Sequence, residues 1–307
     1  MRLLRCNVSD EAAPVLEEFY DDFPPYAILS HRWGKATEEV SFRDIETGAD
    51  ISAKGGYKKF RHCCQQALKD GFQYAWIDTC CIDKSSSAEL SEAINSMYSW
   101  YINSQVCYTY LNDVLPASGN NLKDEASSFR KSAWFTRGWT LQELIAPHNV
   151  RFFDQDWGFI GEKEELAEPV SDITGISADV LKNREISSSV AQRMSWAAGR
   201  KTTRVEDRAY SLMGIFGVNM PILYGEGHRA FIRLQEEIMR NSFDHSLFAW
   251  EATFDDYGFL AKSPDHFSGC GNIVPVDYNT FVAQMQILNG VPDYTQTNVG
   301  TRIQLPL

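Results

Sequence analysis

The side chains best suited to chemistry follow two apolar runs early in this 307-residue chain. Ser30, His31 and Arg32 end the first run, and the stretch from Asp78 to Asp83 follows the second. The guanidinium of Arg32 offers a planar fork of donors that suits phosphate oxygens, and the two carboxylates suit hydroxyl groups. We therefore expect the functional site where these two runs end.

A cysteine nucleophile is a second candidate for the same region. Cys80 and Cys81 need a histidine base, and His31 supplies one if the two runs are neighbouring strands of a parallel sheet. The alternative is that both thiols are packing residues, as reduced cysteines beside strands usually are. The seven cysteines form no CxxC pair, so we expect reduced thiols and no metal site.

Alternating strand and helix patterns predict an α/β fold. The strand-like runs are apolar almost throughout, which is typical of a parallel sheet with helices on both faces. Ligands of such sheets bind beyond the C-terminal ends of the strands. The pattern predicts strands at 26–30, 74–78, 106–111 and 150–153, and helices at 57–70, 86–101 and 139–146, the second of them opening with the capping box Ser86-x-x-Glu89.

Beyond the fourth strand the pattern changes twice. Residues 161–241 are mostly helical, and their best helices are 204–216 and 226–239. After Trp250 the chain is rich in Gly, Pro, Asp and Asn, with β-like pieces at 272–276 and 301–305. We therefore expect three parts, namely an α/β core over 1–153, a helical extension over 154–250 and a β-leaning appendage over 251–307.

Composition excludes several functions. The 29 Lys and Arg residues against 41 Asp and Glu give a net charge of −12, which argues against nucleic acid as a partner because phosphates attract a basic surface. No apolar run approaches the ~18 residues of a membrane span, and the N-terminus lacks a secretory signal pattern, so we expect a cytoplasmic protein. The sequence contains neither a Gly-rich dinucleotide fingerprint nor a P-loop.

Three blocks of the sequence resemble the fungal heterokaryon incompatibility (HET) domain. They are YAILSHRWG at 26–34, AWIDTCCID at 75–83 and RGWTLQEL at 137–144, in the order and at the separations of that family. A fourth block, EDRAYSLMG at 206–214 with LYGEG at 223–227, resembles the extension of the large incompatibility proteins. The resemblance implies non-self recognition that ends in programmed cell death, with a second copy of the chain and a receptor or signalling protein as partners.

The third block also resembles a motif of the TIR domain, a flavodoxin-like α/β module. TIR domains commonly carry Trp-Cys-x-x-Glu-Leu, and this chain has the same pattern over 139–144 with Thr140 in place of the cysteine. In TIR domains that consume NAD+, the glutamate of this motif is the catalytic carboxylate. The resemblance therefore implies a TIR- or flavodoxin-like parallel sheet and assigns the catalytic role to Glu143.

The resemblance further implies NAD+ as a substrate, with no cofactor required. Nicotinamide leaves NAD+ as a neutral molecule, so one carboxylate that stabilises the oxocarbenium-like transition state suffices. The substrate-binding residues would be an arginine for the pyrophosphate, aromatic rings and a histidine stacked on the bases, and two aspartates for the sugar hydroxyls. They are Arg32, then His31, Trp33 and Trp139, then Asp78 and Asp83, with Ser30 and Cys80 beside them.

Each assignment has a structural alternative. Glu143 could lie on a solvated helix face, Arg32 could pair with Asp78, and Trp33 and Trp139 could be core anchors. For the whole chain, the alternative is a non-enzymatic TIR-like module that acts by self-association and partner recruitment. Base exchange or cyclisation of a nucleotide would use the same site as hydrolysis.

Overall fold

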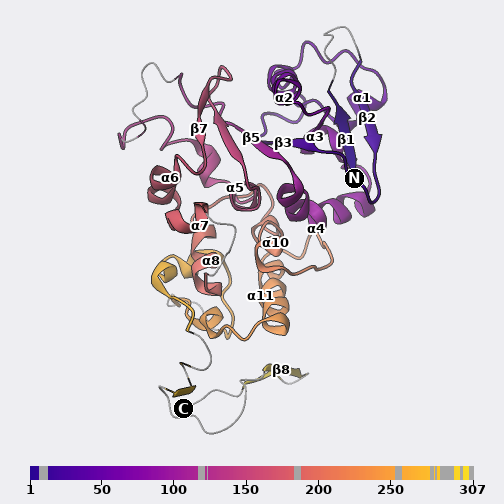
Figure 1. Cartoon of the computed structure of the whole chain (residues 1–307). Coiled ribbons are helices and arrows are strands. Elements are labelled where there is room, and N and C mark those ends of the chain that lie inside the picture. The colour runs from indigo at the N-terminus through magenta and orange to yellow at the C-terminus, as the bar shows by residue number, and fades with distance from the viewer. Residues whose placement is uncertain are drawn as a thin grey trace. The chain divides into compact units, whose positions relative to one another are not determined.

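A computed structural model of the chain describes residues 1–6, 13–116, 122, 124–182, 188–252, 258–276, 280, 282–283, 294–297 and 300–303. The chain divides into two compact units, Met1–Arg184 and Glu185–Leu307, and each is described by itself (Figure 1). The predicted boundary after residue 153 falls between two paired strands, β6 (Val150–Phe153) and β7 (Phe159–Glu162). The α/β core therefore extends further along the chain than the sequence pattern predicts.

The first unit is built on a seven-stranded sheet of order β2-β1-β4-β3-β5-β6-β7. Its other strands are β1 (Arg2–Arg5), β2 (Val15–Glu18), β3 (Tyr26–His31), β4 (Tyr74–Trp76) and β5 (Val106–Tyr110). The four central strands of this sheet, β4, β3, β5 and β6, are parallel to one another, which confirms the predicted α/β class. Numbered by their order along the chain, these four strands lie across the sheet in the order 2-1-3-4, as in flavodoxin-like sheets.

The edges of the sheet are antiparallel, which the sequence pattern did not predict. β1 and β2 pair with each other and β1 pairs with β4 at one edge, while β7 pairs with β6 at the other. The connection from β6 to β7 is a short turn, and a short turn joins antiparallel strands, since a parallel pair needs a long crossover. The sheet is therefore mixed, with a parallel centre.

Helices cover both faces of the parallel centre, as predicted. On one face α2 (Tyr57–Lys69) ends at Asp70, whose carboxylate accepts a 2.6 Å hydrogen bond from Tyr108 of β5. On the other face lies α4 (Ser87–Asn103), where the Trp100 carbonyl accepts a hydrogen bond from Tyr26 of β3. Because side chains alternate along a strand, Ser30 points to the same face as Tyr26, and His31 points to the face of α2.

Five predicted elements match the structure to within one residue at each end, namely the strands at 26–30, 106–111 and 150–153 and the helices at 57–70 and 139–146. The second strand is shorter than predicted, because Asp78 begins α3 (Asp78–Cys81) instead of ending β4. Of the two hydrogen bonds of the predicted capping box, only the one to the Ser86 side chain forms. Ser86 accepts from the Glu89 amide, but the Glu89 carboxylate pairs with Arg2 of β1 instead.

The remaining helices of the first unit are short. They are α1 (Phe42–Glu46), the 3-10 helix η2 (Ala133–Thr136), α5 (Thr140–Ile145), α6 (Ala167–Thr174) and α7 (Ala178–Lys182). The predicted helix at 139–146 corresponds to α5, which carries Glu143.

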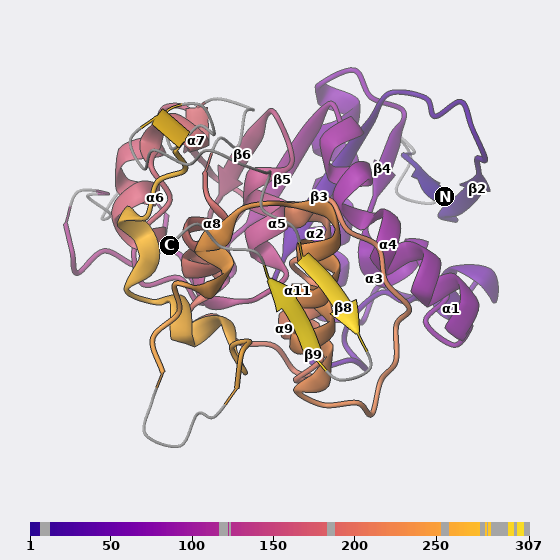
Figure 2. The same cartoon turned by 90° about the horizontal axis from the view of Figure 1, so that it is seen from below.

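The second unit is mainly helical over its described residues. It contains α8 (Val190–Ala197), α9 (Asp207–Tyr210), α10 (Met213–Phe216), α11 (Arg229–Asn241), and the 3-10 helices η3 (His245–Phe248), η4 (Pro264–Phe267) and η5 (Cys270–Asn272). The helix predicted at 204–216 is two short helices, and the strand predicted at 272–276 is absent. β8 (Tyr294–Thr297) and β9 (Gly300–Ile303) form an antiparallel pair, which Figure 2 shows; residues 304–305 of the predicted last strand lie outside the described residues.

The fourth sequence block ties a loop to α9 in this second unit. The Glu206 carboxylate accepts hydrogen bonds from the amides of Gly225 and Gly227, at 2.8 and 3.1 Å. The Tyr224 hydroxyl donates to Asp207 at 3.0 Å. Gly225 and Gly227 both have positive φ, at 105° and 62°, which glycine adopts at no steric cost. The polar residues of this block therefore have a structural role.

Candidate functional site

The candidate site lies at the C-terminal ends of β3 and β5. These strands pair in parallel, with Ser30 opposite Thr109 and His31 opposite Tyr110. β3 is the first parallel strand along the chain, and the second and third, β4 and β5, lie on its two sides. In flavodoxin-like sheets this is the topological switch point, where the loops diverge and ligands bind.

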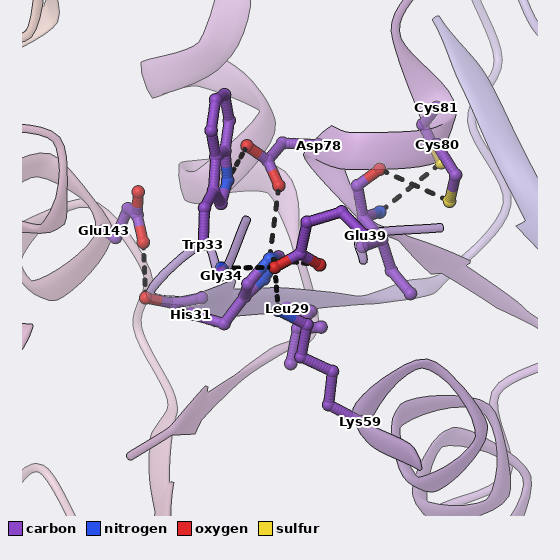
Figure 3. A network of polar contacts seen from close by, with 12 residues as sticks. Leu29, His31, Trp33, Gly34, Glu39, Lys59, Asp78, Cys80, Cys81 and Glu143 are labelled. Carbon is purple, nitrogen blue, oxygen red and sulfur yellow. Dashed lines mark hydrogen bonds and ion pairs between the residues drawn. The ribbon is translucent and has the colours of Figure 1, made fainter. Parts of the chain in front are cut away.

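A chain of buried hydrogen bonds leads to Glu143. Trp134 Nε1 donates to Ser30 Oγ at 2.9 Å, and Ser30 Oγ is hydrogen-bonded to Glu143 Oε2 (Figure 3). An indole nitrogen only donates, so the Ser30 oxygen accepts from Trp134 and its own proton points to the carboxylate. Glu143 is only 8% exposed, and the proposed alternative of a solvated helix face is therefore wrong.

Polar contacts at both ends of α5 hold Glu143 in this place. The Thr140 hydroxyl, in the first turn, donates to the carbonyl of Trp134 at 2.6 Å and contacts that of Arg137 at 3.0 Å. At the other end the buried Lys163 ammonium donates to the carbonyls of Leu144 and Pro147, at 3.2 and 2.6 Å. A cation at this end also complements the helix dipole. Thr140 stands where TIR domains carry cysteine, and its hydroxyl stabilises the start of α5.

Burial changes the protonation of Glu143. It raises the pKa of the carboxyl group to about 8, and the nearby charge of Asp78 adds to the increase. The hydrogen bond from Ser30 and the positive charge of Arg137 act in the opposite direction. Glu143 is therefore mostly protonated at neutral pH and becomes ionised just above it, which is the range in which a carboxyl group can exchange a proton during catalysis.

Three further side chains meet on the α2 face of the same strand end. His31 Nε2 lies 3.9 Å from Glu39 Oε2 and 3.9 Å from Asp78 Oδ1 (Figure 3). Glu39 forms an ion pair with Lys59 of α2 at 2.6 Å. Burial, with the charges of Lys59, Lys84 and Arg137, holds the pKa of His31 well below its ordinary value, so the imidazole is neutral.

Trp33 presents an aromatic ring to solvent beside this cluster. Trp33 is 44% exposed, so the alternative of a core anchor is wrong. The indole nitrogen donates to Asp78 Oδ2 at 2.8 Å, and the Lys84 ammonium lies 3.8 Å from the ring centroid. A cation over one face of the ring and a hydrogen bond at its edge fix its orientation. Trp33 is therefore a preset surface for stacking.

The structure brings together five of the nine predicted site residues. They are Ser30, His31, Trp33, Asp78 and Glu143. Trp139 is half-buried at the start of α5.

The side chains of the other three take no part in these contacts. Asp83 caps a turn, accepting from the Ser85 amide and hydroxyl, and its own amide donates to Glu89. The Cys80 thiol is buried and donates to the carbonyl of Ile77, and burial holds its pKa well above the ordinary value. The burial and the raised pKa favour the alternative in which this thiol is a packing residue. Arg32 is exposed and forms no ion pair with a described residue, so the alternative in which it pairs with Asp78 is also wrong.

Five residues around the site were not identified from the sequence, namely Glu39, Lys59, Lys84, Trp134 and Arg137. Glu39 and Lys59 lie on a loop and a helix whose patterns point to no chemistry. Arg137 belongs to the third block, and its positive charge lowers the pKa of both Glu143 and His31. Its place in that block is the one signal that could have identified it. Arg137, rather than Arg32, is the arginine close to the predicted catalytic residue.

Two other features bear on the kind of site. Within the described ranges, no group of three or more His, Cys, Asp or Glu side chains is arranged to hold a metal ion. No helix of the described part is long and apolar enough to cross a membrane.

Replacement of Trp134 by phenylalanine tests the hydrogen-bond chain. Because Ser30 then loses its buried donor, we expect the free energy of unfolding to fall by about 1–3 kcal/mol. Urea denaturation of Trp134→Phe, Ser30→Ala and the double variant measures this loss. If the bond causes it, Trp134→Phe costs less in the Ser30→Ala background; the same cost in both backgrounds would show that lost ring packing is responsible.

Comparisons with known proteins give the family. The model of the heterokaryon incompatibility protein (HET) family matches residues 26–127, which run from β3 through β5. A model of a domain of unknown function (DUF8212) matches residues 229–259. The chain is 48% identical over 242 residues to the vegetative incompatibility protein HET-E-1 of Podospora anserina. No solved structure matches the chain significantly.

The match to HET-E-1 covers 78% of this chain and 18% of that protein, so the chain spans about a fifth of its relative's length. The matched family segment contains four of the five residues that the structure brings together at the strand ends, and Glu143 follows it. The chain is therefore a heterokaryon incompatibility (HET) domain protein.

Proposed function

We propose that the chain is an effector of fungal non-self recognition that kills the cell by cleaving the nicotinamide–ribose bond of NAD+. The observation that carries the proposal is the buried Glu143, held by Ser30 at the switch point of a flavodoxin-like sheet. The exposed ring of Trp33 and the charge of Arg137 at the same strand ends suit a base and a pyrophosphate. The similarity to a vegetative incompatibility protein supports the cellular role.

The reaction needs one carboxylate and one water molecule. The bond between ribose C1′ and the nicotinamide nitrogen breaks, and its electron pair neutralises the pyridinium. Positive charge develops on the ribose, where ionised Glu143 stabilises it. Water then adds to C1′ and gives up a proton, so that NAD+ and water yield ADP-ribose, nicotinamide and a proton. Because nicotinamide leaves neutral, no second carboxylic acid is required, unlike in most glycosidases.

The burial of Glu143 favours this chemistry. An interaction between opposite charges is stronger in a water-poor environment than in solvent. The pyridinium of bound NAD+ would itself lower the pKa of Glu143, since an opposite charge favours the ionised form. The carboxylate would thus form where the transition state needs it, although the free protein keeps it mostly protonated at neutral pH.

Expression in a heterologous host tests the proposal in cells. We expect wild-type protein to deplete cellular NAD+ before viability falls, and Glu143→Gln at the same expression level to leave both unchanged. Because TIR-like modules can depend on assembly, the expression level should be varied. If Glu143→Gln kills as efficiently as wild type while NAD+ stays constant, the chain acts instead by recruiting partners.

A further inference from the structure

Glu39 and Asp78 each use one carboxylate oxygen and leave the other unpaired. Glu39 Oε1 accepts from the Gly34 amide at 2.5 Å and from Lys59 at 2.6 Å. Asp78 Oδ2 accepts from Trp33 at 2.8 Å. The second oxygens, Oε2 of Glu39 and Oδ1 of Asp78, are buried and have no hydrogen-bond partner among the described residues.

The unpaired oxygens face the imidazole of His31. Its side chain is only 1% exposed, and neither ring nitrogen has a hydrogen-bond partner in the described part of the chain. Nε2 lies 3.9 Å from both unpaired oxygens, which is beyond hydrogen-bond distance. Buried polar groups without partners cost free energy and are rare in native proteins. Three of them at one strand end indicate a group that binds between them.

We infer that His31, Glu39 and Asp78 bind the vicinal diol of a ribose, the adenosine ribose of the dinucleotide. A diol offers two O–H donors and oxygen lone pairs. The two unpaired carboxylate oxygens take the donors, and the N–H of a neutral imidazole donates to a diol oxygen. The inference rests on the proposed function for the identity of the dinucleotide.

The placement of the two subsites fits a dinucleotide. Ser30 and His31 are consecutive in β3 and point to opposite faces, so Glu143 and the Glu39–Asp78 pair lie on the two sides of one strand end. NAD+ has two riboses joined by a pyrophosphate. The positive charge of Arg137 acts on both Glu143 and His31 and has the sign that a pyrophosphate between the two subsites would need.

The same geometry predicts discrimination against a 2′-phosphate. A phosphate ester at the 2′ position removes one of the two O–H donors of the diol. It also places negative charge beside the carboxylates of Glu39 and Asp78, which is unfavourable. The adenosine diol of NAD+ therefore fits the subsite, and that of NADP+ does not.

Titration calorimetry with ADP-ribose and ADP-ribose 2′-phosphate tests the inference without catalysis. We expect wild type to bind ADP-ribose at least tenfold more tightly. Glu39→Gln keeps an acceptor for Lys59 and removes the charge, so the preference should fall below about threefold. Glu38→Gln is the matched control, because Glu38 is the exposed neighbour of Glu39, and it should keep the wild-type preference. Asp78→Asn should act like Glu39→Gln, so a folding defect in one variant leaves the other to decide.

Equal affinity of wild type for the two ligands, or no binding of either, overturns the inference. Its failure is separable from failure of the proposed function. Release of nicotinamide from NAD+ and NADP+ at equal rates would contradict the ribose subsite and leave the hydrolase intact. Selective binding of ADP-ribose without any nicotinamide release would do the reverse.

Discussion

Glu143→Gln should lower the rate of nicotinamide release from NAD+ at least about a thousandfold, which corresponds to roughly 4 kcal/mol of transition-state stabilisation. Glutamine keeps the shape of the side chain and an oxygen that accepts from Ser30, so the buried hydrogen-bond chain survives. It removes the negative charge that faces the developing cation. The rate constant under saturating NAD+ is the quantity to measure, because loss of charge acts mainly on the transition state.

Glu164→Gln provides the matched control for this experiment. Glu164 is exposed in the same unit, and the same chemical change there should leave the rate within twofold of wild type. Circular dichroism of both variants reports whether the fold is kept. A folded Glu143→Gln protein that retains more than a tenth of the wild-type rate would contradict the catalytic role of Glu143.

Activity should rise with pH and level off near pH 8. Burial raises the pKa of Glu143 to about 8 in the free protein, and the ionised form is the one that stabilises the cation. Below that value kcat/KM should therefore increase about tenfold per pH unit. The kcat profile should turn at a lower pH, since the bound pyridinium favours the ionised carboxylate. A kcat/KM profile that is flat from pH 6 to 9 would contradict this assignment.

The same ionisation makes the stability of the fold depend on pH. The pKa of Glu143 is higher in the folded protein than the ordinary value of 4.5, so the native state holds a proton that the unfolded chain releases. The resulting stabilisation is complete below about pH 4.5 and is lost as the pH rises through about 8. Relative to wild type, Glu143→Gln should therefore gain stability across this range, by up to roughly 5 kcal/mol.

Urea denaturation of the two proteins at pH 5, 7 and 9 measures this linkage. The difference in unfolding free energy between Glu143→Gln and wild type should grow from pH 5 to pH 9 in favour of the variant. A constant difference would show that Glu143 ionises alike in the folded and unfolded states. Because this measurement needs no substrate, it tests the burial argument independently of the proposed reaction.

The parallel centre of the fold was predictable because its signals are strong and local. β3 is buried along its whole length and begins with the apolar run from Tyr26 to Leu29, and β5 is buried from Val106 to Thr109. α2 is followed, after its cap at Asp70, by Gly71, whose positive φ of 88° is the conformation expected for a glycine stop. The antiparallel edge strands were not predictable in the same way. β2 contains the charged Glu17 and Glu18, and its half-exposed surface gives no continuous apolar run.

The site was predictable only in part, because strand ends identify positions but not side-chain directions. The alternation along β3 sends Ser30 to Glu143 and His31 to Asp78, and both lie in the cluster. Asp83 stands at a similar place in the sequence, but its carboxylate is used in a turn with Ser85. Glu39 comes from a loop without periodicity, and only the folded chain brings it to His31.

The most direct test of the catalytic role of Glu143 is a crystal structure of Glu143→Gln with bound NAD+. We expect the C1′ atom of the nicotinamide ribose to contact the side chain at position 143, and the adenosine diol to lie within hydrogen-bond distance of Glu39 and Asp78. NAD+ bound elsewhere on the protein, or bound here with its nicotinamide ribose turned away from position 143, would contradict it.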